Sequence, residues 1–198
     1  MPRKLIVGIT GASGILYALR LLDHCELFSD YYKEVFVIYT KAAEKVAEIE
    51  EETDLVKELE KKKCISSIYS DEDFSAPLSS SSFIVGSDMI IVPASLNTIA
   101  KLAHGIQDNL LLRAALSVLR VKGRLVIVPR ETPLSTVDLE NLLRLSQNGA
   151  VILPASPGFY IKPREVIELV DFVVGKILDV LGIENKLYKR WKGDERVT

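Results

Sequence analysis

Arg130 and Glu131 stand side by side just after residues 125–128, an apolar stretch predicted to be a buried strand. A carboxylate at the end of such a strand can act as a general acid or base if it is partly buried. The alternative is that Glu131 simply forms an ion pair with a nearby arginine. Glu131 is therefore a candidate for proton transfer, with Arg130 as its neighbour.

A second candidate is the loop TGASG, residues 10–14, which follows the first apolar run and leads into a predicted helix over residues 15–22. Free N–H groups and the helix dipole favour a phosphate at such a helix start, and glycine allows close approach of the backbone. Gly11, Ala12 and Ser13 are the candidate contacts. The loop is neither a GxGxxG fingerprint nor a P-loop, because the lysine is missing. A tight turn that binds no ligand remains the alternative.

Hydroxyl and amide side chains follow two further strands. Thr40 comes after the second strand, and the segment PASLNT, which contains Ser95, Asn97 and Thr98, comes after the third. These groups could bind a polar ring edge or a phosphate. Ser95 or Asn97 could equally be a plain N-cap of the helix that begins there.

The helix predicted over residues 109–122 is apolar on nearly every side. Its exceptions, Asn109, Arg113, Ser117 and Arg120, form one polar stripe. A helix with so little polar surface must be buried on most sides, which suggests a subunit interface. The two arginines could hold a phosphate, since a guanidinium binds such oxygens in a fork, or could form salt bridges across that interface.

Two further side chains could meet a phosphate near the end of the chain. Tyr160 follows the fifth predicted strand, and Lys176 interrupts a long apolar helix between Gly175 and Ile177. The Lys176 side chain either extends to solvent along the helix surface or is directed at a ligand.

Five short apolar runs would position these residues: 4–9, 35–39, 89–92, 125–128 and 151–153. They are near-continuous rather than alternating, which is typical of parallel strands buried on both faces. Helical segments lie between them, so the sequence predicts an α/β fold, a three-layer Rossmann-like or flavodoxin-like parallel sheet with helices on both faces. Ligands bind such sheets at the carboxyl ends of the strands, where all of the loop candidates fall.

Other segments are less tied to the site. The charged stretch 41–59 is predicted to form one or two exposed helices, and the serines at 79–82 a loop. The long helix near the end should bury one stripe, made of Val166, Val170, Val173, Ile177 and Val180.

Composition excludes several classes of protein. The chain has 198 residues, 48% hydrophobic residues and a net charge of −2, which suits one domain over 1–198 and gives no case for nucleic-acid binding. No apolar run reaches the ~18 residues of a membrane span. The first strand leaves no room for a signal peptide, so we expect a cytoplasmic protein.

Metal and disulfide chemistry have little support in the sequence. The two cysteines, Cys25 and Cys64, do not make a disulfide framework. The two histidines, His24 and His104, have no third ligand type clustered nearby, so no metal site is expected.

Taken together, the motifs resemble those of the UbiX-like flavin prenyltransferases. The matching segments are GITGASG, PASLNT, AHGIQDNLLLRAA, RLVIVPRETPL, GAVILPASPGFY and VDFVVGKILDVLGI, followed by RW, and they span nearly the whole chain. PRETPL and the PASPGFY segment are the most selective of them. The chain departs from the family pattern at two charged positions, with arginine at 120 and lysine at 176 where the family commonly has lysine and arginine.

The resemblance implies an enzyme that transfers a dimethylallyl group from dimethylallyl monophosphate to reduced FMN, at N5 and C6, for use by a UbiD-type decarboxylase. It implies Glu131 and Ser13 for proton transfer. It implies a phosphate grip by Arg113, Arg120, Tyr160 and Lys176 in place of a metal ion, some of them from a neighbouring subunit of a homododecamer. The implied FMN contacts are Gly11, Ala12, Ser13, Thr40, Ser95, Leu96, Asn97, Thr98 and Arg130.

Two other functions remain open at this stage. The FMN-dependent cysteine decarboxylases share this fold and have a segment similar to PASLNT, but they use a histidine base, and neither His24 nor His104 is suitably placed in the sequence. A non-catalytic FMN-binding subunit is the other alternative, although it should lack the phosphate grip.

Overall fold

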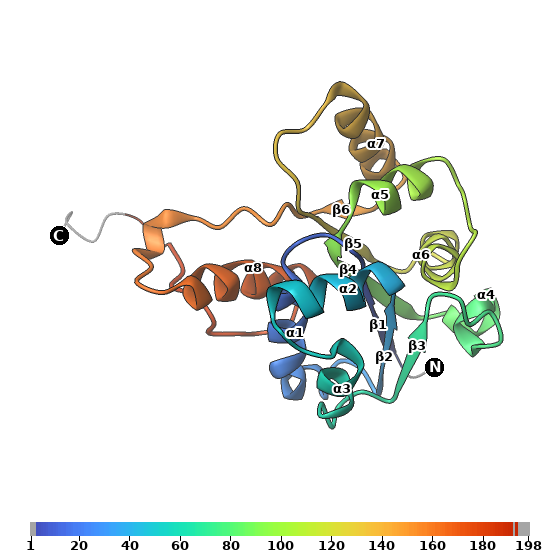
Figure 1. The fold of residues 1–198 in the computed structure, drawn as a ribbon, viewed down its shortest axis with the longest axis horizontal. Coiled ribbons are helices and arrows are strands. Elements are labelled where there is room, and N and C mark those ends of the chain that lie inside the picture. Colours follow the sequence, from blue (N-terminus) through green and yellow to red (C-terminus); the bar gives the residue numbers. More distant parts are fainter. Residues whose placement is uncertain (1–2, 192, 194–198) are drawn as a thin grey trace.

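The computed structural model of the chain describes residues 3–191 and 193. Its centre is a parallel sheet in the order β3-β2-β1-β4-β5-β6, which confirms the predicted α/β fold (Figure 1). The strands are β1 (Lys4–Ile9), β2 (Glu34–Tyr39), β3 (Ser67–Ser70), β4 (Ser87–Ala94), β5 (Leu125–Pro129) and β6 (Val151–Ile152).

The strand β3 was not predicted. Its sequence, SIYS, has no apolar run. Among the strands of the described residues it pairs only with β2, at the edge of the sheet, where Phe36 lies opposite Ser67. An edge strand covered on one side needs less apolar surface than a central one. By contrast, every residue of β1, β4 and β5 is buried, as the continuous apolar runs predicted.

Helices cover both faces of the sheet. One face packs against α1 (Ile15–Asp23), α2 (Lys41–Glu50), α3 (Leu55–Glu60) and α8 (Val166–Leu181). The other packs against α4 (Ser81–Ile84), α5 (Leu96–Ala103), α6 (Leu110–Arg120) and α7 (Thr136–Gln147). Along β1, Leu5 and Val7 join the first core and Ile6 the second, as the period-two alternation of a strand requires.

Four expectations need correction. The apolar helix α6 is buried by its own chain, with Leu111, Ala114 and Ala115 fully covered in the second core, so its composition does not require a subunit interface. Val166 is 71% exposed at the start of α8 and does not belong to the buried stripe. The serines at 79–82 are not a plain loop, because Ser79 ends a 3-10 turn (Pro77–Ser79), Ser80 is the N-cap of α4, and Ser81 and Ser82 begin α4.

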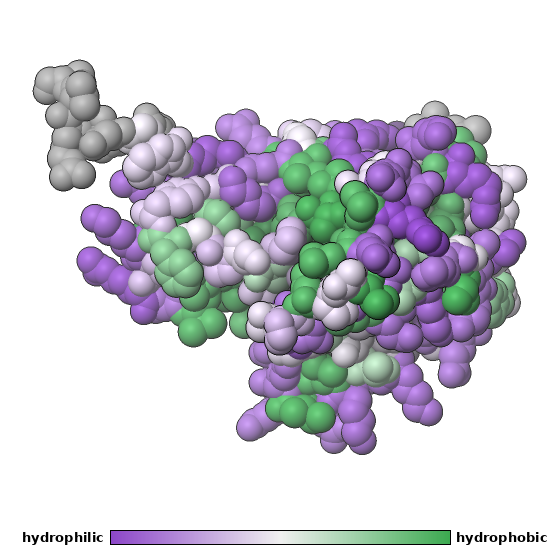
Figure 2. Space-filling model, turned by 90° about the horizontal axis from the view of Figure 1, so that it is seen from above, coloured by the Kyte–Doolittle hydropathy of each residue, from purple (hydrophilic) through white to green (hydrophobic). Residues whose placement is uncertain are grey.

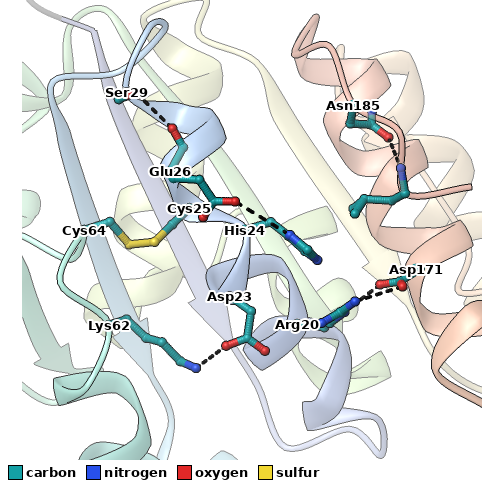
Figure 3. Close-up of polar contacts among 11 residues, drawn as sticks. Arg20, Asp23, His24, Cys25, Glu26, Ser29, Lys62, Cys64, Asp171 and Asn185 are labelled. Carbon is teal, nitrogen blue, oxygen red and sulfur yellow. Dashed lines mark hydrogen bonds and ion pairs between the residues drawn. A yellow bond between two sulfur atoms is a disulfide. The ribbon is translucent and has the colours of Figure 1, made fainter.

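The fourth correction concerns Cys25 and Cys64, which form a disulfide 39 residues apart in sequence. It joins the 3-10 turn after α1 to the segment before β3, and a bidentate ion pair between Arg20 of α1 and Asp171 of α8 lies nearby (Figure 3). Two cysteines this far apart in the sequence carry no pairing signal; the fold brings them together.

Within the described residues, no helix is long and apolar enough to cross a membrane. In the same part of the chain, no group of three His, Cys, Asp or Glu side chains is arranged to hold a metal ion.

The disulfide should stabilise the chain, because it closes a long loop that contains β2 and α2. The chain-entropy model gives about 4 kcal/mol for a loop of this length, or roughly 10 °C in Tm for a chain of this size. We expect Cys25→Ser and reduced wild-type protein to melt at the same lowered temperature in a calorimetric scan. Identical melting of oxidised and reduced wild type would contradict this role.

Candidate active site

A polar cavity of about 380 Å³ opens at the carboxyl ends of β1, β2 and β4. The sheet order places β1 between β2 and β4, so the loops that follow these three strands share one edge. Five of the predicted cofactor residues line this cavity, namely Gly11, Thr40, Ser95, Asn97 and Thr98. Parallel strands alone suffice to bring them together from distant parts of the sequence.

Two helices begin at this cavity. Thr40 is the N-cap of α2, and its Oγ1 accepts a hydrogen bond from the N–H of Ala43 at 3.2 Å. Ser95 is the N-cap of α5, and its Oγ accepts from the N–H of Thr98 at 3.3 Å. The capping interpretation of Ser95 is therefore confirmed, and it does not exclude ligand binding. Each cap satisfies one N–H of the first turn, and the positive end of each helix dipole still favours an anion.

Thr10 links the loops of β1 and β4, and it was not predicted as a functional residue. It is buried, its Oγ1 donates to the carbonyl of Pro93 at 2.7 Å, and the same oxygen accepts from the N–H of Ser95 at 2.8 Å. These bonds fix the start of α5 relative to the TGASG loop. A threonine directly after a buried strand was the available signal.

Gly11 also has a packing role that was not predicted. A Cβ at Gly11 would lie 2.4 Å from the Cβ of Ala42 and 3.0 Å from its carbonyl carbon. The missing side chain therefore lets the first turn of α2 approach the loop. Gly11 also lines the cavity, so its predicted contact with a ligand stays a prediction.

The start of α1 does interact with an anion, but that anion is a carboxylate of the chain. The N–H of Gly14 donates to Oε2 of Glu50, the last residue of α2, at 2.7 Å. The N–H of Gly14 is therefore already paired, and a phosphate contact at the rest of this loop stays a prediction.

The end of β3 contributes an acceptor that was not predicted. Asp71 lines the cavity, and its Oδ2 accepts from the Asn109 amide at 2.7 Å, while Asn109 Oδ1 caps α6 through the N–H of Leu112. Burial raises the pKa of Asp71. Helix N-termini, hydroxyl groups and this carboxylate together fit a ligand that carries both a phosphate and hydroxyl donors, as FMN does in its ribityl phosphate.

Arg130 joins the end of β5 to the TGASG loop, because its Nε donates to the carbonyl of Ser13 at 3.0 Å. Glu131 lies beside it but is exposed and, among the described residues, accepts a hydrogen bond only from the N–H of Thr132. The partial burial that a general acid or base needs is therefore absent in the isolated chain. Ala12 is buried, whereas Ser13 and Leu96 are half-buried and do not line the cavity.

The four residues of the predicted phosphate grip fall into separate places. Tyr160 and Lys176 both contact Phe172 of α8, with the rings of Tyr160 and Phe172 5.8 Å apart and Lys176 Nζ 5.5 Å from the Phe172 ring. Arg113 donates to the carbonyl of Ser79, and Arg120 donates to Ser117 on the other face of the sheet. One chain therefore assembles only the Tyr160–Lys176 half of the grip.

Replacing Gly11 with alanine should weaken FMN binding, because the new methyl group would push the α2 start away from the cavity. We expect at least a tenfold higher Kd for FMN in a fluorescence titration. Gly149→Ala is the control. A Cβ at Gly149 would meet no atom within 4 Å, so this variant adds only the backbone strain of its φ of 96° and no clash. Unchanged FMN affinity in Gly11→Ala would contradict the packing role assigned to Gly11.

The fold closely matches solved structures. The crystal structure of AnUbiX (PadA1) in complex with FMN and dimethylallyl pyrophosphate aligns with a TM-score of 0.88 and 34% identity, covering 98% of this chain and 100% of the other. A dodecameric FMN-dependent UbiX-like decarboxylase from Escherichia coli O157:H7 aligns with a TM-score of 0.87 and 36% identity, covering 96% of this chain and 100% of the other. The peptidyl-cysteine decarboxylase EpiD aligns at 0.58 with 22% identity, which shows a shared fold alone.

The sequence comparisons agree with the predicted resemblance. The Flavoprotein family model matches residues 1–189. Flavin prenyltransferase UbiX from Thermoplasma acidophilum is 47% identical over 95% of this chain and 99% of its own length. The chain is thus a member of the Flavoprotein family and belongs, within it, to the flavin prenyltransferases of the UbiX type.

Proposed function

We propose that this enzyme transfers a dimethylallyl group from dimethylallyl monophosphate to N5 and C6 of reduced FMN. The observation that carries the proposal is the cavity at the ends of β1, β2 and β4, where the starts of α2 and α5 and the side chains of Thr40, Ser95, Asn97 and Thr98 offer a site for a phosphorylated, hydroxyl-bearing ligand. Arg130 and the TGASG loop would border the flavin. When bound, the reduced flavin supplies the nucleophile of the reaction.

The chain's own residues would act mainly on the leaving phosphate. Breaking an allylic C–O bond leaves negative charge on the phosphate oxygens, and fixed cations and hydroxyl donors stabilise that charge. Lys176 and Tyr160 supply an ammonium and a phenol on one side of Phe172. We assign Arg113 and Arg120 to the same role from a neighbouring copy, because within one chain they lie on the other face of the sheet.

Glu131 and Ser13 would move protons. Arg130 keeps the two segments together through its bond to the Ser13 carbonyl. Because Glu131 is exposed in a single chain, a second copy packed over the PRETPL loop would supply the burial that proton transfer requires.

An oligomer would both complete the phosphate grip and bury Glu131. Just beyond that loop, α7 exposes Val137, Leu139 and Leu143 at 64%, 54% and 58%. Figure 2, which views the molecule from the side of α7, shows apolar side chains gathered in the middle of this face. Apolar patches of this kind commonly mark protein interfaces, and we propose a homododecamer like the related protein from Escherichia coli O157:H7.

The remaining expectations stay proposals. We treat 1–198 as a single FMN-binding domain whose C-terminal helix and tail serve oligomer contacts; residues 192 and 194–198 of that tail lie outside the described residues. A UbiD-type decarboxylase would receive the prenylated flavin. The charged phosphate substrates do not cross membranes unaided, which favours activity in the cytoplasm.

Mass spectrometry of the extracted flavin tests the proposal. The protein is incubated without oxygen with reduced FMN and dimethylallyl monophosphate or, separately, dimethylallyl pyrophosphate. A gain of one C5H8 unit is expected with the monophosphate. Bound but unmodified FMN with both donors would reject the proposal and direct the next assay to cysteinyl peptides or to a flavin carrier.

Glu131→Gln should retain FMN and lose turnover. The amide has the same shape but cannot act as an acid or base near neutral pH, and a positioned acid or base contributes roughly a hundredfold or more. Single-turnover prenylation followed by absorbance, beside an FMN titration, measures both quantities. Wild-type turnover in the variant would remove the proton-transfer role.

Lys176→Ala should weaken binding of the prenyl donor more than binding of FMN. Loss of a charge-assisted contact to phosphate is expected to raise the donor KM by about tenfold or more, with FMN affinity within twofold of wild type. Lys162→Ala, at an exposed lysine on the turn after Tyr160, is the matched control. Equal losses of donor and FMN would mean that Lys176 is structural.

A further inference from the structure

The C-terminal strap, residues 183–191, folds back over α8 next to Lys176. We propose that Tyr188 and Arg190 of this strap are positioning residues for Lys176. They donate hydrogen bonds to the Asp179 carboxylate, so that the Lys176 ammonium does not pair with it and stays available to the donor phosphate. This inference rests on the proposed function, because it assumes that Lys176 binds that phosphate.

Gly175 makes the close packing of the strap possible. α8 ends at Leu181, and its C-cap Gly182, with a φ of 79°, turns the chain back. A Cβ at Gly175 would lie 2.4 Å from Cδ1 of Tyr188 and 3.1 Å from Oδ1 of Asn185. The Tyr188 ring then packs 5.0 Å from that of Phe172, the residue that also contacts Tyr160. The strap is thus built onto the helix face that carries the phosphate grip.

Within the described part of the chain, every side-chain hydrogen bond to Asp179 comes from the strap. Its Oδ1 accepts from Arg190 at 2.5 Å and from Asn185 at 2.9 Å, and its Oδ2 accepts from Arg190 at 3.1 Å and from the Tyr188 hydroxyl. Burial would raise the pKa of Asp179, but these hydrogen bonds outweigh it and lower the pKa. Both carboxylate oxygens are therefore occupied.

On a bare helix, Lys176 and Asp179 would be natural ion-pair partners, since they are three residues apart. Among residues 3–191 and 193, however, no carboxylate lies within 4.0 Å of Lys176 Nζ. The ammonium instead lies 4.9 Å from the Tyr188 ring centre, and hydrogen bonding to Tyr188 raises the pKa of Lys176.

The location of Lys176 fits a ligand-binding role. With Asp179, it lines a groove of about 500 Å³ between α8 and the segment 151–156. A phosphate entering this groove would meet an ammonium held on aromatic rings and a carboxylate already neutralised by Arg190. Without Arg190, the same carboxylate would compete with the phosphate for Lys176 and repel it.

Steady-state prenylation with varied donor tests the inference on the full-length protein. Tyr188→Phe keeps the packed ring and removes only the hydroxyl, and Arg190→Gln frees the charge of Asp179. Both should raise the donor KM about fivefold, the scale of one ordinary hydrogen bond. FMN affinity and Tm should stay near wild type. Tyr31→Phe, outside the strap, is the control for loss of a tyrosine hydroxyl.

The double variant Lys176→Ala/Tyr188→Phe separates positioning from structure. If Tyr188 acts through Lys176, the double variant should have the donor KM of Lys176→Ala alone. Additive losses, or a wild-type KM in both single strap variants, would overturn the positioning role while leaving the proposed function intact. A wild-type KM in Lys176→Ala would refute the phosphate role of Lys176 and this inference together.

Discussion

The parallel alignment of β1, β2 and β4 is the constraint on which the rest of the site depends. It places three carboxyl ends at one edge, so that the helices starting after Thr40 and Ser95 direct their positive ends at a single cavity. Thr10 then fixes the loops of β1 and β4 to each other through the Pro93 carbonyl and the Ser95 N–H. Gly11 allows α2 to approach. Each of these contacts is between backbone and small side chains, which explains why the motifs consist of glycine, serine and threonine.

The two halves of the proposed chemistry differ in how complete they are within one chain. The cavity that suits FMN is built from one polypeptide. The phosphate grip is divided. Tyr160 lies on the turn before α8 and Lys176 on α8 itself, whereas Arg113 and Arg120 lie on α6 across the sheet. The exposed apolar side of α7 and the exposed Glu131 lie on the same stretch of chain. Assembly of copies would therefore both bury α7 and complete the catalytic groups.

How far the sequence predicts the structure depends on the kind of signal. Buried parallel strands leave continuous apolar runs, so β1, β2, β4, β5 and β6 were found, and the residues at their ends followed from the fold rule. The polar edge strand β3 lacks that signal, and Asp71 at its end was missed with it. The half-exposed α7 was missed as well. The Cys25–Cys64 bridge, the Gly11–Ala42 contact and the Glu50 carboxylate at Gly14 join positions 31 to 39 residues apart, and only the folded chain shows them.

The most direct test of this account is calorimetric titration of the protein with FMN and with riboflavin, which lacks only the phosphate. If the helix starts at Thr40 and Ser95 hold that phosphate, FMN should bind at least a hundredfold more tightly, the scale of two or more charge-assisted hydrogen bonds. The ratio of FMN affinity to riboflavin affinity should be smaller in Thr98→Val than in the wild type. Equal affinity for the two flavins would contradict the central claim that the sheet edge is a phosphate site.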